Sequence, residues 1–182
     1  MCVQRQSRAL LKIVRSKVTG ELLYTFAMPR SRSIAAAIVL GGIVAGVLDI
    51  LDAIIFFNLR GVAPVRLLQG IASGLLGLHA FSGGVHTAML GLALHFFIAF
   101  VCATIFVIAA QSIPFLTKHP VRSGLWYGAI IYIVMNYLVV PHSRVLHLRP
   151  APAALANGIL AVLLLVGLPI SLITRRFAYP SN

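Results

Sequence analysis

Asp49 and Asp52 interrupt the apolar run GGIVAGVLDILDAIIFF, residues 41–57, and are the clearest candidates for chemistry in the chain. They are two of only three acidic residues. On insertion scales, a carboxylate near the middle of a membrane costs roughly 2.5–3.5 kcal/mol. Two neighbouring carboxylates also repel each other, so at least one would be protonated or would be bridged to a cation or an imidazole. The pair therefore indicates proton or cation binding inside an apolar segment.

His95, Asn136 and Asn157 are expected near the depth of the two aspartates. At 1.5 Å per residue, His95 lies on the order of 15 Å into its own apolar run, close to the level of Asp49. We hypothesise that His95 pairs with Asp49 or Asp52 and that all five residues belong to a buried polar cluster that binds an ion or a proton. The alternative is that the histidine and the asparagines only form hydrogen bonds between helices, worth about 0.6 kcal/mol each on average. Whether a metal ion takes part stays open.

The composition is that of an integral membrane protein. Of 182 residues, 60% are hydrophobic and only 10% are charged, whereas soluble domains are nearer one half apolar. The formal net charge is +12. Attraction to anionic lipid head groups explains this charge more simply than nucleic acid does. Membrane lipids are therefore the expected partners, and nucleic acid is not.

Four apolar stretches are long enough to cross a bilayer as helices, which takes about 20 residues. They span residues 34–57, 85–111, 122–141 and 153–174. The shorter apolar stretch 67–82 predicts an interfacial or re-entrant helix between the first and second spans. The expected fold is all-α, with a transmembrane domain over residues 34–174 between a basic segment, 1–33, and a short tail, 175–182.

The basic residues predict the orientation in the membrane. Eleven of them fall on one side of the expected spans: Arg5, Arg8, Lys12, Arg15, Lys17, Arg30, Arg32, Lys118, Arg122, Arg175 and Arg176. Four fall on the other side: Arg60, Arg66, Arg144 and Arg149. By the positive-inside rule, both termini are cytoplasmic. We expect a multi-pass protein of the bacterial inner membrane.

The first 33 residues allow more than one interpretation. Arg5, Arg8, Lys12 and Arg15 recur at three- and four-residue spacing, as in a basic helix that lies on an anionic leaflet. A loosely ordered tail is the alternative. An Arg- and Ser-rich start without acids also fits a mitochondrial transit peptide, and Met28 is a second candidate for the initiator.

Small residues form stripes along the first two spans. One stripe contains Gly41, Gly42, Ala45, Gly46 and Ala53, and the other contains Gly84, Ala88, Gly91, His95, Ala99 and Cys102. Such stripes let neighbouring helices approach closely, within one chain or between copies in a homo-oligomer. The two aspartates share the first stripe, so we expect them to face the interior of the bundle.

Three segments carry a resemblance to known proteins: LLQGIASGLLG, HTAMLGLALHFFIAF and YGAIIYIVMNYLVVP. In these segments the chain resembles small bacterial inner-membrane proteins of the YagU type, over roughly residues 34–174. The resemblance implies a small multispanning protein of unassigned activity. It matches no diagnostic motif residue by residue, so it carries over no catalytic residues.

Two classes of function fit these features. In the first, Asp49, Asp52 and His95 bind or move a proton, a cation or a small solute. In the second, the protein has a structural, assembly or lipid-associated role without transport or catalysis. An enzyme is not expected, because the chain has no HExxH, GxSxG or Gly-rich phosphate loop. No cofactor is expected either, since His86 and His95 share one span and cannot both bind the same haem there.

Overall fold

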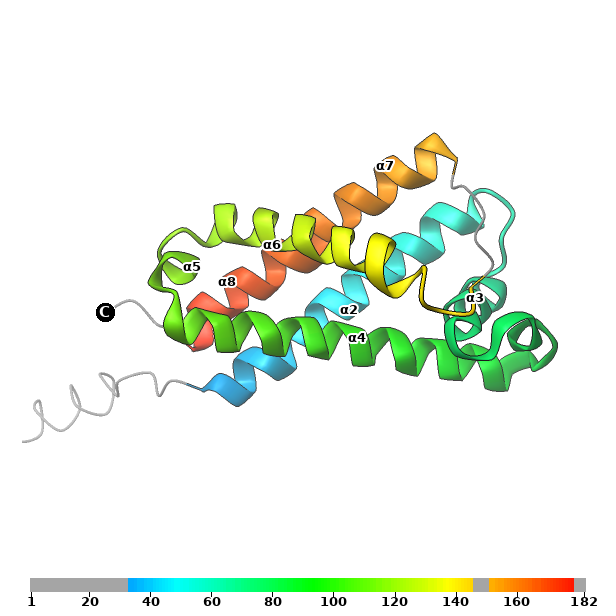
Figure 1. Ribbon diagram of the computed structural model, residues 1–182, viewed down its shortest axis with the longest axis horizontal. Helices are drawn as coiled ribbons and strands as arrows, with labels where there is room; N and C mark the ends of the chain where they lie inside the picture. The colour runs from blue at the N-terminus through cyan, green and yellow to red at the C-terminus, as the bar shows by residue number, and fades with distance from the viewer. Residues whose placement is uncertain (1–32, 146–150, 179–182) are drawn as a thin grey trace, which may run out of the picture. The chain divides into compact units, whose positions relative to one another are not determined.

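The computed structural model describes residues 33–145 and 151–178, and every regular element in these two ranges is helical (Figure 1). The elements are α2 (Ile34–Asn58), α3 (Pro64–Leu76), the 3₁₀ segment η1 (Gly77–Ser82), α4 (Gly84–Ser112), α5 (Pro114–Lys118), α6 (Pro120–Val134), the π-helical segment η2 (Met135–Val139), α7 (Pro152–Ala161), the π-helical segment η3 (Val162–Gly167) and α8 (Leu168–Phe177). The expectations for the N-terminal basic segment and for the last four residues lie outside the described residues.

Local sequence explains where the helices begin. Proline occupies the first turn of α3, α5, α6 and α7, where its missing N–H would have no helical partner in any case. The Ser33 hydroxyl accepts a hydrogen bond of 3.1 Å from the Ala36 N–H and so caps α2. At the end of α3, Gly77 adopts φ 61°, a conformation that favours glycine. Helix boundaries in this chain therefore follow its prolines and glycines.

Three helical stretches are long and apolar enough to cross a membrane: Ile34–Asn58, Gly84–Ser112 and Pro152–Phe177. This confirms the all-helical class, and these three stretches coincide with three of the four expected spans. The fourth expected span, 122–141, corresponds to two elements, α6 and the π-helical segment η2, and is not among these three stretches. The stretch 67–82 is likewise two elements, α3 and η1. The four-span count and a re-entrant helix remain predictions.

The helices pack in the order α4, α2, α8, α6. Helix α2 contacts α4 on one side and α8 with η3 on the other, and α6 packs against η3 and α8. Direct contact between α4 and α6 is slight. It centres on Tyr127, whose hydroxyl donates a 2.7 Å hydrogen bond to the Cys102 carbonyl. The ring of Tyr127 also packs against Phe106, with 4.9 Å between centroids.

Glycines bring helix backbones together where α6 meets the last span. A Cβ atom at Gly128 would lie 2.7 Å from the Leu163 Cα, and one at Gly167 would overlap the Gly124 carbonyl oxygen. Gly124 and Gly128 form a GxxxG pair in GLWYG, the spacing that permits close helix contact in membranes. Glycines of the expected stripe on α2 have a different role, because Gly42 and Gly46 make room for the side chains of Phe100 and Phe96 on α4.

A cap made of α3, η1 and residues 140–145 covers one end of the bundle. Gly91 on α4 allows the α3 backbone at Leu68 to lie against it. The Gln69 side chain, buried at 4% exposure, donates a 2.9 Å hydrogen bond to the Gly84 carbonyl. The Arg144 N–H donates to the Gly74 carbonyl at 3.0 Å. The cap therefore connects α3 both to α4 and to the segment that follows η2.

The opposite end is closed by a hydrogen bond between the first and last described helices. The Ser33 N–H donates to the Phe177 carbonyl at 3.0 Å. Figure 1 shows this end, with α5 and the end of α8, facing away from α3.

Candidate functional site

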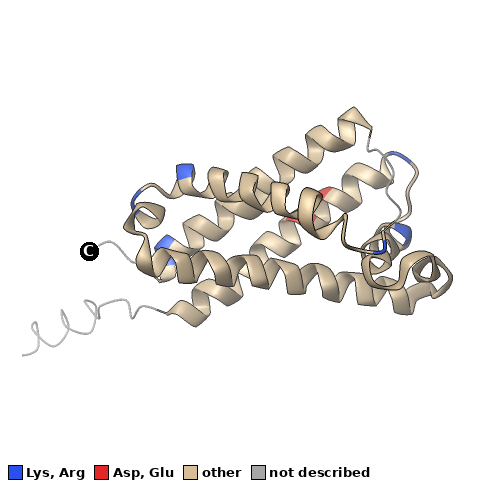
Figure 2. Ribbon diagram, viewed as in Figure 1, with Lys and Arg blue, Asp and Glu red and all other residues tan. Residues whose placement is uncertain are grey.

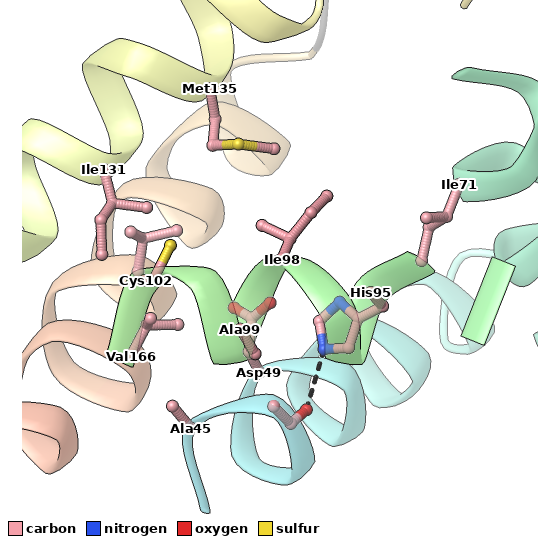
Figure 3. A pocket seen from close by; sticks show the side chains of 12 residues that line it. Ala45, Asp49, Ile71, His95, Ile98, Ala99, Cys102, Ile131, Met135 and Val166 are labelled. Carbon is pink, nitrogen blue, oxygen red and sulfur yellow. Dashed lines mark hydrogen bonds between the residues drawn. The ribbon is translucent and has the colours of Figure 1, made fainter. Parts of the chain in front are cut away.

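A cavity of about 240 Å³ lies among the helices and includes Asp49 and His95 in its lining (Figure 3). Helices α2, α4 and α6 and the segments η2 and η3 form most of the wall, and Ile71 of α3 completes it. Apart from the carboxylate and the imidazole, the lining side chains are aliphatic or sulfur-containing. Ligand sites commonly combine apolar walls with a few polar groups in this way.

His95 is held in place by the backbone of the neighbouring helix. Its Nε2 lies 2.9 Å from the Gly46 carbonyl oxygen. A carbonyl only accepts hydrogen bonds, so Nε2 must carry the proton. Figure 3 shows the other ring nitrogen, Nδ1, on the side of the ring away from Gly46. Nδ1 is engaged by none of the described residues and is available to a ligand in the cavity.

Asp49 presents a carboxylate to the same cavity. Its side chain is half-buried and makes no hydrogen bond to another described residue. No fully buried polar side-chain atom among the described residues lacks a partner, which means that the Asp49 oxygens keep access to the cavity. The carboxylate is therefore the group that an entering ligand would meet.

Asp52 has different surroundings, although it is only three residues away. Its Oδ2 accepts a 2.7 Å hydrogen bond from the Nδ2 of Asn157. This bond joins α2 to α7, and neither residue lines the cavity. The two aspartates thus divide into one that faces the cavity and one that connects two helices.

The expected buried cluster of all five polar residues was wrong. Asp49, Asp52, His95 and Asn157 are half-buried, and His95 bonds to a backbone carbonyl instead of pairing with a carboxylate. Asn136 is exposed and donates to the Tyr132 carbonyl of its own helix at 2.9 Å. Counting residues along a helix estimates depth but not side-chain direction, and Asn136 lies in π-helical turns that change the direction of each side chain.

Sequence reasoning missed two contributions to the site. One is the GLWYG motif, whose glycines bring α6 close to η3. This motif is visible in the sequence. The other is the pair of π-helical segments that supply Met135, Val162 and Val166 to the cavity wall. Such segments occur frequently at functional sites, but nothing in MNYLV or VLLLVG indicates them.

Neither a metal site nor a family relationship assigns a function to the cavity. Within residues 33–145 and 151–178, no three His, Cys, Asp or Glu side chains come together as a candidate metal site. The chain matches no protein-family model, and no curated protein or solved structure shows significant similarity to it. The resemblance to YagU-type proteins therefore stays an expectation.

The Asp52–Asn157 hydrogen bond predicts energetic coupling between α2 and α7. We expect Asp52→Ala and Asn157→Ala to be non-additive by about 0.5–2 kcal/mol, because a bond between membrane helices contributes on this scale. Reversible unfolding in mixed detergent, applied to a double-mutant cycle, measures the coupling. Asn136→Ala is the control partner because its side chain bonds within its own helix. Equal coupling of Asp52 to both asparagines would contradict the assignment.

Proposed function

We propose that the protein crosses a bacterial inner membrane with four helices and with both ends of the bundle segment, residues 33 and 178, on the cytoplasmic side. Residues 120–139 are the fourth span, comprising the 15 residues of α6 and the 5 of η2. At about 1.5 Å per residue this stretch approaches the roughly 30 Å of a hydrocarbon layer. The cytoplasmic assignment rests on the basic residues before Ser33, because the described residues carry cations at both ends (Figure 2).

We further propose that the cavity binds a small organic cation. The observation that carries this proposal is the Asp49 carboxylate, which makes no hydrogen bond to a described residue and faces a cavity whose lining, apart from His95, is apolar. A carboxylate in surroundings of low dielectric attracts a cation strongly. The aliphatic walls favour a cation with hydrocarbon substituents, since inorganic ions such as Ca²⁺ require six or more oxygen ligands.

His95 has a supporting role in this proposal. With Nε2 fixed on the Gly46 carbonyl, Nδ1 can hydrogen-bond a substituent on the ligand.

Binding of benzyltrimethylammonium to the protein in nanodiscs tests the proposal. We expect saturable binding to the native chain and a loss of about tenfold or more in Asp49→Asn, equal to at least 1.4 kcal/mol. Asp52→Asn is the matched control. It removes the same charge only three residues from Asp49, but from a carboxylate that does not line the cavity. We expect it to change the Kd by less than about twofold. Absence of saturable binding, or an equal loss in both variants, would refute the cation site.

The second candidate function is a structural or assembly role without transport or catalysis. The Asp52–Asn157 bond favours it, because that aspartate already has a purely structural contact. Under this alternative, Asp49→Asn would lower the Tm in detergent as much as Asp52→Asn does and would leave flux across proteoliposomes unchanged. Under the cation proposal, Asp49→Asn keeps or raises the Tm and changes binding.

A further inference from the structure

A basic cleft of about 340 Å³ opens where α5, α6 and α8 meet. Its charged side chains are Lys118 and Arg122, on either side of the α5–α6 junction, and Arg175 in the last turn of α8. His119 also lines it, and all four side chains are exposed. Figure 2 shows Lys and Arg positions at this end of the bundle, and others at the opposite end.

Among the residues that the structure describes, no carboxylate balances the positive charge in the cleft. No acidic residue lines the cleft, and the two aspartates among the described residues lie on α2, in the contacts given above. Three cations around one hollow repel each other, and an anion bound between them relieves that repulsion. Arginine also forms paired N–H···O bonds with phosphate oxygens. The cleft is therefore complementary to a phosphate group.

A buried hydrogen bond positions the two sides of the cleft. The Ser171 hydroxyl donates to the Pro120 carbonyl at 2.7 Å. Ser171 lies one turn before Arg175 on α8, and Pro120 lies two residues before Arg122 on α6. The bond thus holds the helix segments that carry the two arginines against each other. Because this framework is already formed, little backbone ordering has to accompany binding.

The surroundings of the cleft favour a phosphate that belongs to a lipid. The cleft lies at an end of the membrane-crossing helices, which is the level of the head groups. Trp126 follows Arg122 by four residues on the same face of α6, and its side chain is 71% exposed. Exposed tryptophan at this level is typical of the membrane interface. Val121, at 52% exposure, lines the cleft itself and adds apolar surface beside Arg122.

We propose that this cleft binds the phosphate of an anionic phospholipid such as cardiolipin or phosphatidylglycerol. Lys118, Arg122 and Arg175 contact the phosphate oxygens, and the acyl chains run along α6 past Trp126. The site is separate from the cavity at Asp49 and does not depend on the proposed cation binding. It specifies one lipid-binding position, in contrast to a general attraction between a basic surface and a membrane.

Native mass spectrometry of the full chain in detergent, titrated with cardiolipin and with phosphatidylcholine, tests the proposal. We expect tighter binding of cardiolipin and a loss of about fivefold in its affinity in Arg175→Gln, as expected for one cation near a lipid surface. Arg176→Gln is the matched control, because Arg176 is the next exposed residue and does not line the cleft. We expect a change of less than about twofold there. The Tm of each variant shows that it is folded.

Three outcomes would overturn the proposal. Equal losses in Arg175→Gln and Arg176→Gln would show diffuse attraction without a site. Equal affinity for cardiolipin and phosphatidylcholine would show that the cleft does not recognise the net negative charge of the phospholipid. Displacement of cardiolipin by inorganic phosphate at comparable concentration would show a site for a free anion.

Discussion

Gly167→Ala is expected to destabilise the folded bundle by about 1–3 kcal/mol, the usual cost of overpacking. The added methyl group would overlap the Gly124 carbonyl oxygen and would lie 2.7 Å from the Gly128 N atom. These are backbone atoms, so no side-chain rotation can relieve the contact. Helix α6 would have to move away from η3, and the cavity wall would move with it. Reversible unfolding in mixed detergent measures the change.

Gly158→Ala is the matched control for Gly167→Ala because it makes the same change on the same span. The added methyl group there meets only the Tyr132 Cε2, at 3.9 Å, an ordinary van der Waals contact. Alanine is better than glycine in a helix by about 1 kcal/mol. We therefore expect Gly158→Ala to be neutral or stabilising. Similar effects in the two variants would mean that helix propensity outweighs the close backbone contact.

Gly91→Ala is expected to detach α3 from α4 locally while the rest of the bundle stays folded. A Cβ atom at position 91 would overlap the Leu68 carbonyl oxygen and would lie 2.8 Å from the carbonyl carbon. Movement of α3 would withdraw Ile71 from the cavity. Hydrogen exchange should therefore rise by tenfold or more across residues 64–76, since a loss of about 1.4 kcal/mol in local stability has this effect.

Gly74→Ala on α3 serves as the control for Gly91→Ala. Its added methyl group would meet the Val145 Cγ2 at 3.8 Å, which requires no displacement. We expect its exchange over residues 64–76 to match that of the native chain. Unchanged exchange in Gly91→Ala would contradict the close packing of α3 on α4. Uniform unfolding of the whole bundle would contradict the view of α3 as part of a separable cap.

The positions of the helices could be predicted from the sequence because length and proline placement determine them. The expected stretch 34–57 becomes α2 with one added residue, and 85–111 becomes α4 with one added residue at each end. The π-helical turns after Val134 could not be predicted. They depend on packing against a neighbouring helix, and their residues also suit an ordinary α-helix.

The candidate site was predictable only in part, because two of the five expected residues line the cavity. Depth along two antiparallel helices places His95 near Asp49, and the structure brings both to one cavity. The partner of His95 depends on how each helix is rotated about its own axis, and a rotation by the angle between successive residues changes that partner. The distribution of apolar residues does not determine this rotation when all faces of the helix are apolar. For the same reason, Asp49 and Asp52 look equivalent in sequence, yet one faces the cavity and the other bonds to Asn157.

The hydrogen bond between Ser33 and Phe177 constrains how many times the chain crosses a membrane. Two atoms 3.0 Å apart must lie on the same side of a bilayer. A path that returns to its starting side crosses an even number of times. Three long apolar helices cannot complete such a path by themselves, which supports residues 120–139 as a further crossing. One accessibility label at position 33 or 178 would then report the orientation of both ends.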